Sequence, residues 1–267
     1  MRLLQDAMDS FVRERMKQGG EAGALAEECM EGLADYLVHY SDLFRDELAE
    51  AEEPQLADWE EALEAQMNEL MDGDMDAGPE LHGLELAQLE PEHMRDFFGW
   101  YLLREIGDDA TGIEAYAETV RDWLAFMRKQ GDLDQARHLE FMAVVNDMAD
   151  ECVRAARAMR LLFHYVRLGG GGSPRLRGQR FSRFVEGHAR VLSLGEHQVW
   201  LGFDSQSERI GPVPVAREIA ALLREGDVLD VELGLRGDVW LMVDIGPVYP
   251  ASVYVEAEEF GPPGKVS

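Results

Sequence analysis

The residues with the clearest chemical potential are arginines that recur between positions 154 and 190. Nine arginines and one acid, Glu186, fall within residues 153–190, in a chain with 53 acidic and 25 basic residues. On a helix, spacings of three and four place side chains along one side. Such a row could contact a polyanion or an acidic protein surface. The residues assigned to this contact are Arg157, Arg160, Arg167, Arg175, Arg177, Arg180, Arg183 and Arg190.

Two interpretations of these arginines are open. In the first, they neutralise the chain's own acidic residues, within one molecule or across a homo-oligomer, and Trp200 and Trp240 dock a small domain onto the helices. In the second, they follow a nucleic-acid backbone, and the same tryptophans are stacking platforms. The sheet face expected beside them carries the carboxylates Glu186, Asp204, Asp230, Glu232 and Asp244. Carboxylates on a binding face would repel phosphates, which favours the first interpretation.

An acidic loop is the strongest metal candidate. Asp72, Asp74 and Asp76 occupy the first, third and fifth positions of a helix-loop-helix calcium motif. However, Ala77 stands where the motif needs glycine, and Gly83 stands where it needs a bidentate glutamate. We therefore expect a solvated acidic loop, with calcium binding as the alternative.

Other catalytic and cofactor signatures are missing from the sequence. The "GGGGSPR" stretch lacks the Gly-Lys-Ser/Thr ending of a phosphate loop, and no Gly-x-Ser-x-Gly elbow occurs. Glu90 and His93 form a single Glu-x-x-His pair, and Cys29 and Cys152 lack a Cys-x-x-Cys partner. We expect no catalytic residue, no resident metal and no cofactor. This favours a non-enzymatic protein without settling the question of activity.

The net charge of −28 is unevenly spread. Residues 1–152 carry a net −28, residues 153–190 a net +8, and residues 191–267 a net −8. A field this negative argues against a general nucleic-acid binder, although screening lets a local basic strip act at short range. No apolar run is long enough for a membrane span, and the N-terminus is charged where a signal peptide would be apolar. The expectation is a cytoplasmic protein that does not engage a membrane.

Hydrophobic periodicity predicts an α + β chain: an all-helical N-terminal domain followed by a small, mostly antiparallel β-barrel containing one helix. The domains expected are an acidic helical domain at 1–168, a Gly/Arg-rich linker at 169–180, a barrel at 181–258 and a flexible tail at 259–267. The helices expected are 2–18, 21–52, 55–71, 90–106, 111–130 and 134–168. The barrel elements expected are strands at 184–194, 199–203 and 209–213, a helix at 213–226, strands at 229–235 and 239–245, and a further strand at 252–257.

Two partial resemblances support these elements. The run "GPVPVAREIAALLREGDVLDVEL" resembles a passage of ribosomal-protein-type RNA-binding barrels of the oligonucleotide-binding (OB) fold, and implies an OB-like barrel over about 181–245. An SH3-like barrel with an inserted helix is the alternative. Residues 94–131 resemble the helical core-binding domain of tyrosine recombinases, through Tyr116, Val120, Arg121, Trp123, Leu124 and Phe126. No "HxxR" motif follows, so that likeness implies a helical hairpin without strand-transfer chemistry.

The sequence thus favours a non-enzymatic binding or regulatory protein that acts through protein contacts or self-association. The alternative is a nucleic-acid-associated protein that uses the arginines and the barrel.

Overall fold

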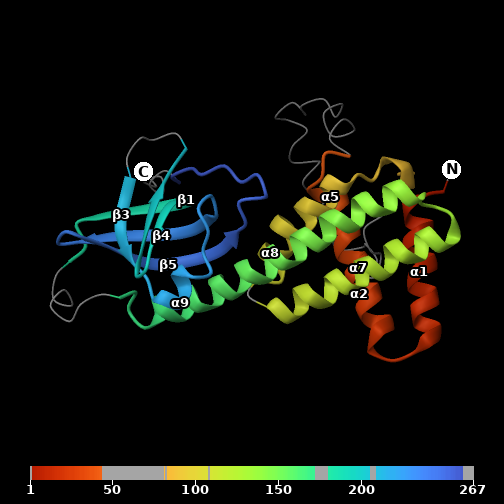
Figure 1. The fold of residues 1–267 in the computed structure, drawn as a ribbon, viewed down its shortest axis with the longest axis horizontal. Coiled ribbons are helices and arrows are strands. Elements are labelled where there is room, and N and C mark those ends of the chain that lie inside the picture. The colour runs from red at the N-terminus through yellow and green to blue at the C-terminus, as the bar shows by residue number, and fades with distance from the viewer. Residues whose placement is uncertain are drawn as a thin grey trace, which may run out of the picture. The chain divides into compact units, whose positions relative to one another are not determined.

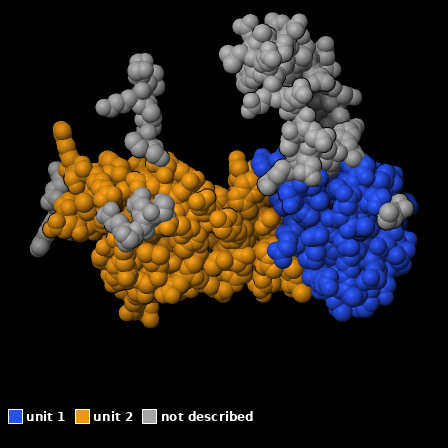
Figure 2. Space-filling view, turned by 90° about the horizontal axis from the view of Figure 1, so that it is seen from above, with its two compact units in different colours: residues 1–93, 118–142 blue, residues 94–117, 143–267 orange. Residues whose placement is uncertain are grey.

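The computed structural model describes residues 2–43, 81, 83–107, 109–171, 180–204 and 209–260. Helices occupy the N-terminal part and a five-stranded antiparallel sheet the C-terminal part (Figure 1), which confirms the predicted mixture of helix and strand. The chain forms two compact units (Figure 2), one of residues 1–93 with 118–142 and the other of residues 94–117 with 143–267. The second unit therefore holds the predicted linker, the sheet and most of the helix before it.

The first unit is built on a helical hairpin. Helices α1 (Leu4–Gln18) and α2 (Glu21–His39) are joined by Gly19 and Gly20, both at positive φ. A short 3-10 helix η1 (Leu86–Gln88) follows, and residues 118–130 and 135–142 complete the unit. Its core contains fully buried large side chains, among them Phe11, Leu33, Leu37 and Trp123. Within each helix, apolar residues at helical spacing, such as Leu33 and Leu37 on α2, lie on the side that faces this core.

Helices α7 (Ala110–Gln130) and α8 (Gln135–Arg167) have well-defined ends. The side chain of Asp109 accepts a hydrogen bond from the Thr111 N–H at 3.0 Å, so Asp109 is the N-cap of α7. The spacing of Thr111 and Glu114 in the sequence predicts a capping box with Thr111 as N-cap; this prediction is wrong, because Thr111 already lies inside α7 and the N-cap is two residues earlier. Gly131 ends α7 at positive φ, and Asp134 caps α8 by accepting from the Arg137 N–H at 2.8 Å, both as predicted.

The helix predicted at 90–106 changes its winding partway. It runs as α5 (Pro91–Asp96), then the π-helical segment η2 (Phe97–Leu102), then α6 (Leu103–Glu105). Gly99 lies in η2 and faces the side chains of Met148 and Val253, and a Cβ there would stand 2.0 Å from a Val253 methyl group. A wider helix turn and a missing side chain together let residue 253 approach the helix axis.

The sheet has strand order β3-β2-β1-β4-β5, with every neighbouring pair antiparallel. Its strands are β1 (Arg183–Gly195), β2 (Gln198–Gly202), β3 (Arg209–Pro214), β4 (Val228–Arg236) and β5 (Val239–Tyr249). The central strand β1 pairs with β4 along its first half and with β2 along its second. Buried Val185, Ala189 and Val191 alternate with more exposed residues, which is the period-two pattern that predicted this strand.

The sheet is not closed into a barrel by strand pairing. The edge strands β3 and β5 approach each other, yet no ladder joins them in the described part of the sheet. The end of α8 bridges the two edges instead. The Tyr165 hydroxyl donates to the backbone oxygen of Pro214 in β3 at 3.0 Å, and Gly170 lies against the backbone oxygen of Met242 in β5. The predicted β-barrel is therefore confirmed only as an antiparallel sheet, which is open.

Three further predictions need correction or refinement. The helix predicted at 213–226 is one turn, α9 (Arg217–Ala220), because β3 continues to Pro214 and Ala216 is still extended. No ladder strand forms at 252–257: the Val253 N–H donates to the Pro250 oxygen in a turn, and the Val255 oxygen accepts from Arg190. The four glycines after α8 were predicted to begin a linker, but the N–H groups of Gly169 and Gly170 bond back to Val166 and Tyr165. Gly169 and Gly170 therefore end helix α8 in a Schellman motif.

Candidate functional site

Among the described members of the predicted arginine strip, two pair with carboxylates of the chain. Arg157 lies 3.2 Å from Glu114, and Arg190 donates two hydrogen bonds to the carboxylate of Asp204 at 2.6 and 2.9 Å. The Arg167 guanidinium lies 4.7 Å above the ring of Phe163. The remaining described members, Arg160, Arg180 and Arg183, are exposed. Arg175 and Arg177 lie outside the described residues, as do Asp72, Asp74 and Asp76 of the predicted acidic loop.

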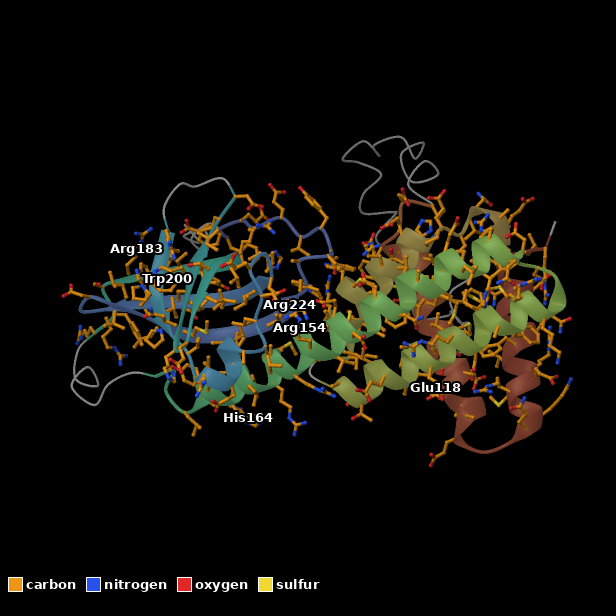
Figure 3. All side chains as sticks on the ribbon, viewed as in Figure 1. Glu118, Arg154, His164, Arg183, Trp200 and Arg224 are labelled. Carbon is orange, nitrogen blue, oxygen red and sulfur yellow. The ribbon has the colours of Figure 1, made fainter. Side chains whose placement is uncertain are left out.

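One arginine just before the predicted strip has the most buried partner. Arg154 on α8 donates to both oxygens of Asp227 at 2.8 and 2.9 Å, and Asp227 is fully buried. It also pairs with Glu151, to which Arg224 donates as well; Figure 3 labels Arg154 and Arg224. Burial alone would lower the pKa of Arg154, but its hydrogen bonds to Asp227 and Glu151 raise it above the usual value. This group attaches α8 to the turn before β4, which the sequence did not reveal.

Each of the two predicted tryptophans has an arginine over its ring (Figure 3 labels Trp200 and Arg183). Trp200 on β2 has the guanidinium of Arg209 at 4.6 Å, and Trp240 on β5 has that of Arg183 at 5.6 Å. Gly211 passes beside the Trp200 ring, where a Cβ would stand 2.9 Å from it. These contacts lie within the sheet, so both rings are held in place on it by cation–π stacking.

Three carboxylates stand side by side across the sheet, and we call them the carboxylate row. Glu186 on β1 is directly opposite Glu232 on β4, which is directly opposite Asp244 on β5. Opposite residues of antiparallel strands have Cβ atoms about 4.5–5.5 Å apart, so the like charges repel. Burial, together with Glu186 and Asp244, raises the pKa of Glu232 above its usual value.

The acidic character continues beside the row. Asp230 on β4 is opposite His188 on β1. Burial raises the pKa of the Asp230 carboxyl; the charge of His188 opposes this rise, whereas Glu186 and Asp244 add to it. The imidazole of His188 lies between the rings of Tyr249 and Phe260, at 5.9 and 5.0 Å between centroids. The predicted gathering of carboxylates on a sheet face is thus observed for Glu186, Asp230, Glu232 and Asp244, whereas Asp204 pairs with Arg190.

The C-terminal segment of the chain covers one side of this face. Residues 253–260, which we call the C-terminal strap, run along the first half of β1. The backbone N–H of Phe260 donates to the backbone oxygen of Glu186 at 2.7 Å, and the backbone N–H of His188 donates to the backbone oxygen of Glu258 at 2.9 Å. A flexible tail was predicted from residue 259, and no pattern in the sequence indicates that residues 259 and 260 lie beside β1. The alternation that predicted a strand at 252–257 is present as buried Val253, Val255 and Ala257, but it stops before the residues that contact β1.

Other places for a ligand offer less. A cavity of about 350 Å³ in the first unit is lined by residues including Arg2 and Arg137. Arg2 already pairs with Asp132, and Arg137 donates to the backbone oxygens of Ala87 and Leu89. Within the described ranges, no three His, Cys, Asp or Glu side chains come together so as to hold a metal ion.

Comparisons of the chain with protein-family models, with curated proteins and with solved structures gave no match. In the part of the chain that the structure describes, no helix combines the length and the apolar character that crossing a membrane requires.

Proposed function

We propose that this chain is a non-catalytic binding module that acts through protein contacts. The observation that carries the proposal is the carboxylate row on the sheet, next to a predicted basic strip whose Arg157 and Arg190 are already paired with the chain's own carboxylates. An acidic sheet face repels nucleic-acid phosphates and attracts a basic protein surface. The partner expected is therefore a basic region of another protein.

A binding series tests this proposal. The full chain is titrated, over a range of salt, with lysine homopolymer and with single- and double-stranded DNA and RNA. Glu232→Gln combined with Asp244→Asn removes two charges from the carboxylate row, and Glu27→Gln combined with Glu31→Gln removes two from the exposed side of α2 as a matched control. Lysine homopolymer is expected to lose at least about threefold more affinity with the first pair of changes than with the control pair.

The proposal fails if the two double variants weaken binding equally, because the net charge alone would then explain it. It also fails if nucleic acid binds with a steep salt dependence that Arg175→Glu, Arg177→Glu and Arg180→Glu together abolish.

The second candidate function is nucleic-acid association through an OB-like barrel. Its support is the strand connectivity: β1, β2 and β3 form a meander, α9 precedes β4, and β4 pairs with the first half of β1. This strand order supports an OB-like over an SH3-like arrangement, and in the OB fold the face of the second and third strands binds oligonucleotides. Trp200 and Arg209 lie on those two strands.

The measurement for this candidate is the affinity of single-stranded DNA and RNA for Trp200→Ala, with Trp240→Ala as the control. Loss of about 1–3 kcal/mol of binding free energy for the first variant only would favour a stacking site. Equal affinity in both variants would remove this candidate.

A further inference from the structure

The carboxylate row lies on a larger acidic surface of the sheet. Side chains two residues apart on a strand point to the same face, so Asp230 on β4 shares the face of Glu232. On the strap, Glu258 stands opposite His188, and opposite residues of paired strands also share a face. We call this surface the acidic face; its carboxylates are Glu186, Asp230, Glu232, Asp244 and Glu258.

Aromatic rings flank Glu186 on the acidic face. Phe184 lies two residues before Glu186 on β1, and the antiparallel pairing of the strap places Phe260 opposite Glu186. The Phe260 ring contacts that of His188, which lies on the same face of β1. The side of Phe184 is 52% exposed and that of Phe260 37% exposed. A ligand that reaches Glu186 therefore meets aromatic surface on two sides.

The strand next to Phe184 makes room for a second ring. Gly234 on β4 stands opposite Phe184, and a Cβ on Gly234 would lie 2.6 Å from the Phe181 ring. The missing side chain lets Phe181 lie against the sheet, with its ring centroid 5.1 Å from that of Phe184. The guanidinium of Arg236 lies 3.9 Å from the centroid of the Phe181 ring. The chain thus already holds one guanidinium against a ring beside the acidic face, and the exposed Phe184 ring could receive another.

Carboxylates beside aromatic rings suit arginine better than lysine. A planar guanidinium stacks on a ring and donates two parallel hydrogen bonds to a carboxylate, whereas an ammonium is a compact, strongly hydrated point charge. The pairing of Glu186 with Glu232 sets two like charges side by side, and a bound guanidinium would neutralise them. Of the arginines on this face, Arg190 already pairs with Asp204. Charge complementarity therefore favours a cationic partner.

We propose that the acidic face binds an arginine-rich segment of a partner protein and places one arginine between the Phe184 ring and Glu186. The guanidinium stacks on Phe184 and donates to the Glu186 carboxylate, while Phe260 borders it on the side of the strap. The inference rests on the proposed function and specifies the cation that the acidic face selects, which is arginine rather than lysine.

The test compares two acetylated, amidated octapeptides, octa-arginine and octa-lysine, which carry the same charge. Each is titrated into the full chain at about 0.15 M salt, and the ratio of the two dissociation constants is the arginine preference. The wild-type chain is expected to bind octa-arginine at least about fivefold more tightly than octa-lysine.

Substitutions that keep the charge of the chain locate this preference. Phe184→Leu removes the ring but keeps an apolar side chain, so the arginine preference should fall at least about threefold, whereas Phe184→Tyr keeps the ring and should keep the preference. Phe163→Leu is the matched control, because Phe163 on α8 is 40% exposed and also has an arginine, Arg167, over its ring. It should leave the preference unchanged. Thermal unfolding of each variant is compared with that of the wild type to show that the sheet is intact.

Equal affinity of the wild type for the two peptides, or the same arginine preference in Phe184→Leu and Phe163→Leu, would overturn the inference. The double change of Glu232→Gln with Asp244→Asn separates this failure from failure of the proposed function. If both peptides lose affinity with that change while Phe184→Leu keeps the preference, the acidic face binds cations without selecting arginine, and the proposed function stands. If neither peptide loses more affinity than with the control pair on α2, the proposed function itself is lost.

Discussion

The ion pair between Arg154 and Asp227 gives the sharpest prediction about stability. Arg154 side-chain exposure is 10% and that of Asp227 is zero, so Arg154→Met leaves a buried carboxylate without its counter-charge. Removing one partner of a buried pair typically costs about 3–5 kcal/mol. The carboxylate keeps hydrogen bonds from the backbone N–H groups of Arg224 and Ala251, at 2.8 and 3.3 Å, so we expect the lower end, about 3 kcal/mol.

A matched control lies one turn further along α8. Arg157 pairs with Glu114, but the two side chains are 59% and 57% exposed. An exposed pair of this kind contributes less than about 1 kcal/mol, so Arg157→Met should leave the free energy of unfolding almost unchanged. Urea unfolding of the full chain, followed by circular dichroism, measures both variants under the same conditions.

A double-mutant cycle then separates the pair from its parts. In the double variant Arg154→Met with Asp227→Asn, no charge is left unpaired by the loss of the guanidinium. We therefore expect it to be at least about 1 kcal/mol more stable than the sum of the two single losses predicts. The reasoning is refuted if Arg154→Met costs no more than Arg157→Met, or if the two losses simply add.

Three other predictions follow from single contacts. Gly170→Ala should destabilise the chain by about 2 kcal/mol or more, because its φ is +58° and its Cβ would stand 2.6 Å from a β5 backbone oxygen; Gly169→Ala, at φ +103° with open space around it, should cost about half as much in thermal unfolding. Glu232→Gln should raise the free energy of unfolding by about 0.5 kcal/mol at pH 7 and have little effect at pH 4. Because the pKa of Glu232 is raised in the folded chain, its protonated carboxyl adds to the free energy of unfolding below the unfolded pKa, and this contribution is lost as pH rises through the folded pKa. The same change in free energy of unfolding by Glu232→Gln at pH 7 and at pH 4 would contradict this. Burial raises the pKa of both thiols, Cys29 and Cys152, so iodoacetamide at pH 8 should label neither until urea opens its own unit; fast labelling of native chain would contradict the buried positions.

The sequence predicted the elements well wherever a local pattern decides them. Period-two alternation marked β1, β4 and β5, and Gly131 and Asp134 lie where one expected helix ends and the next begins. Closure of the barrel and the length of α9 were predicted less well. Both depend on how distant segments pack, and no periodicity records that.

The candidate site was predicted unevenly for the same reason. Alternation along β1 and β4 placed Glu186 and Glu232 on one face, and the structure pairs them. Helical spacing also placed Arg157 in the predicted strip, but it did not indicate that Arg154 would be the arginine with a buried partner. Arg154 and its partner Asp227 are 73 residues apart in sequence, and the bridge between β1 and the strap joins Gly187 with Glu259, which are almost as far apart. Such pairs arise from tertiary packing, so only the folded chain shows them.

The open sheet has two places where strand pairing stops, and different elements cover them. Between β3 and β5, the end of α8 supplies a tyrosine hydrogen bond and Gly170, fixed by the Schellman turn of a 33-residue helix. Replacing that closure would require unwinding the helix end. Along β1, the C-terminal strap continues the pairing through backbone hydrogen bonds of Glu258 and Phe260, and the Phe260 ring lies beside His188.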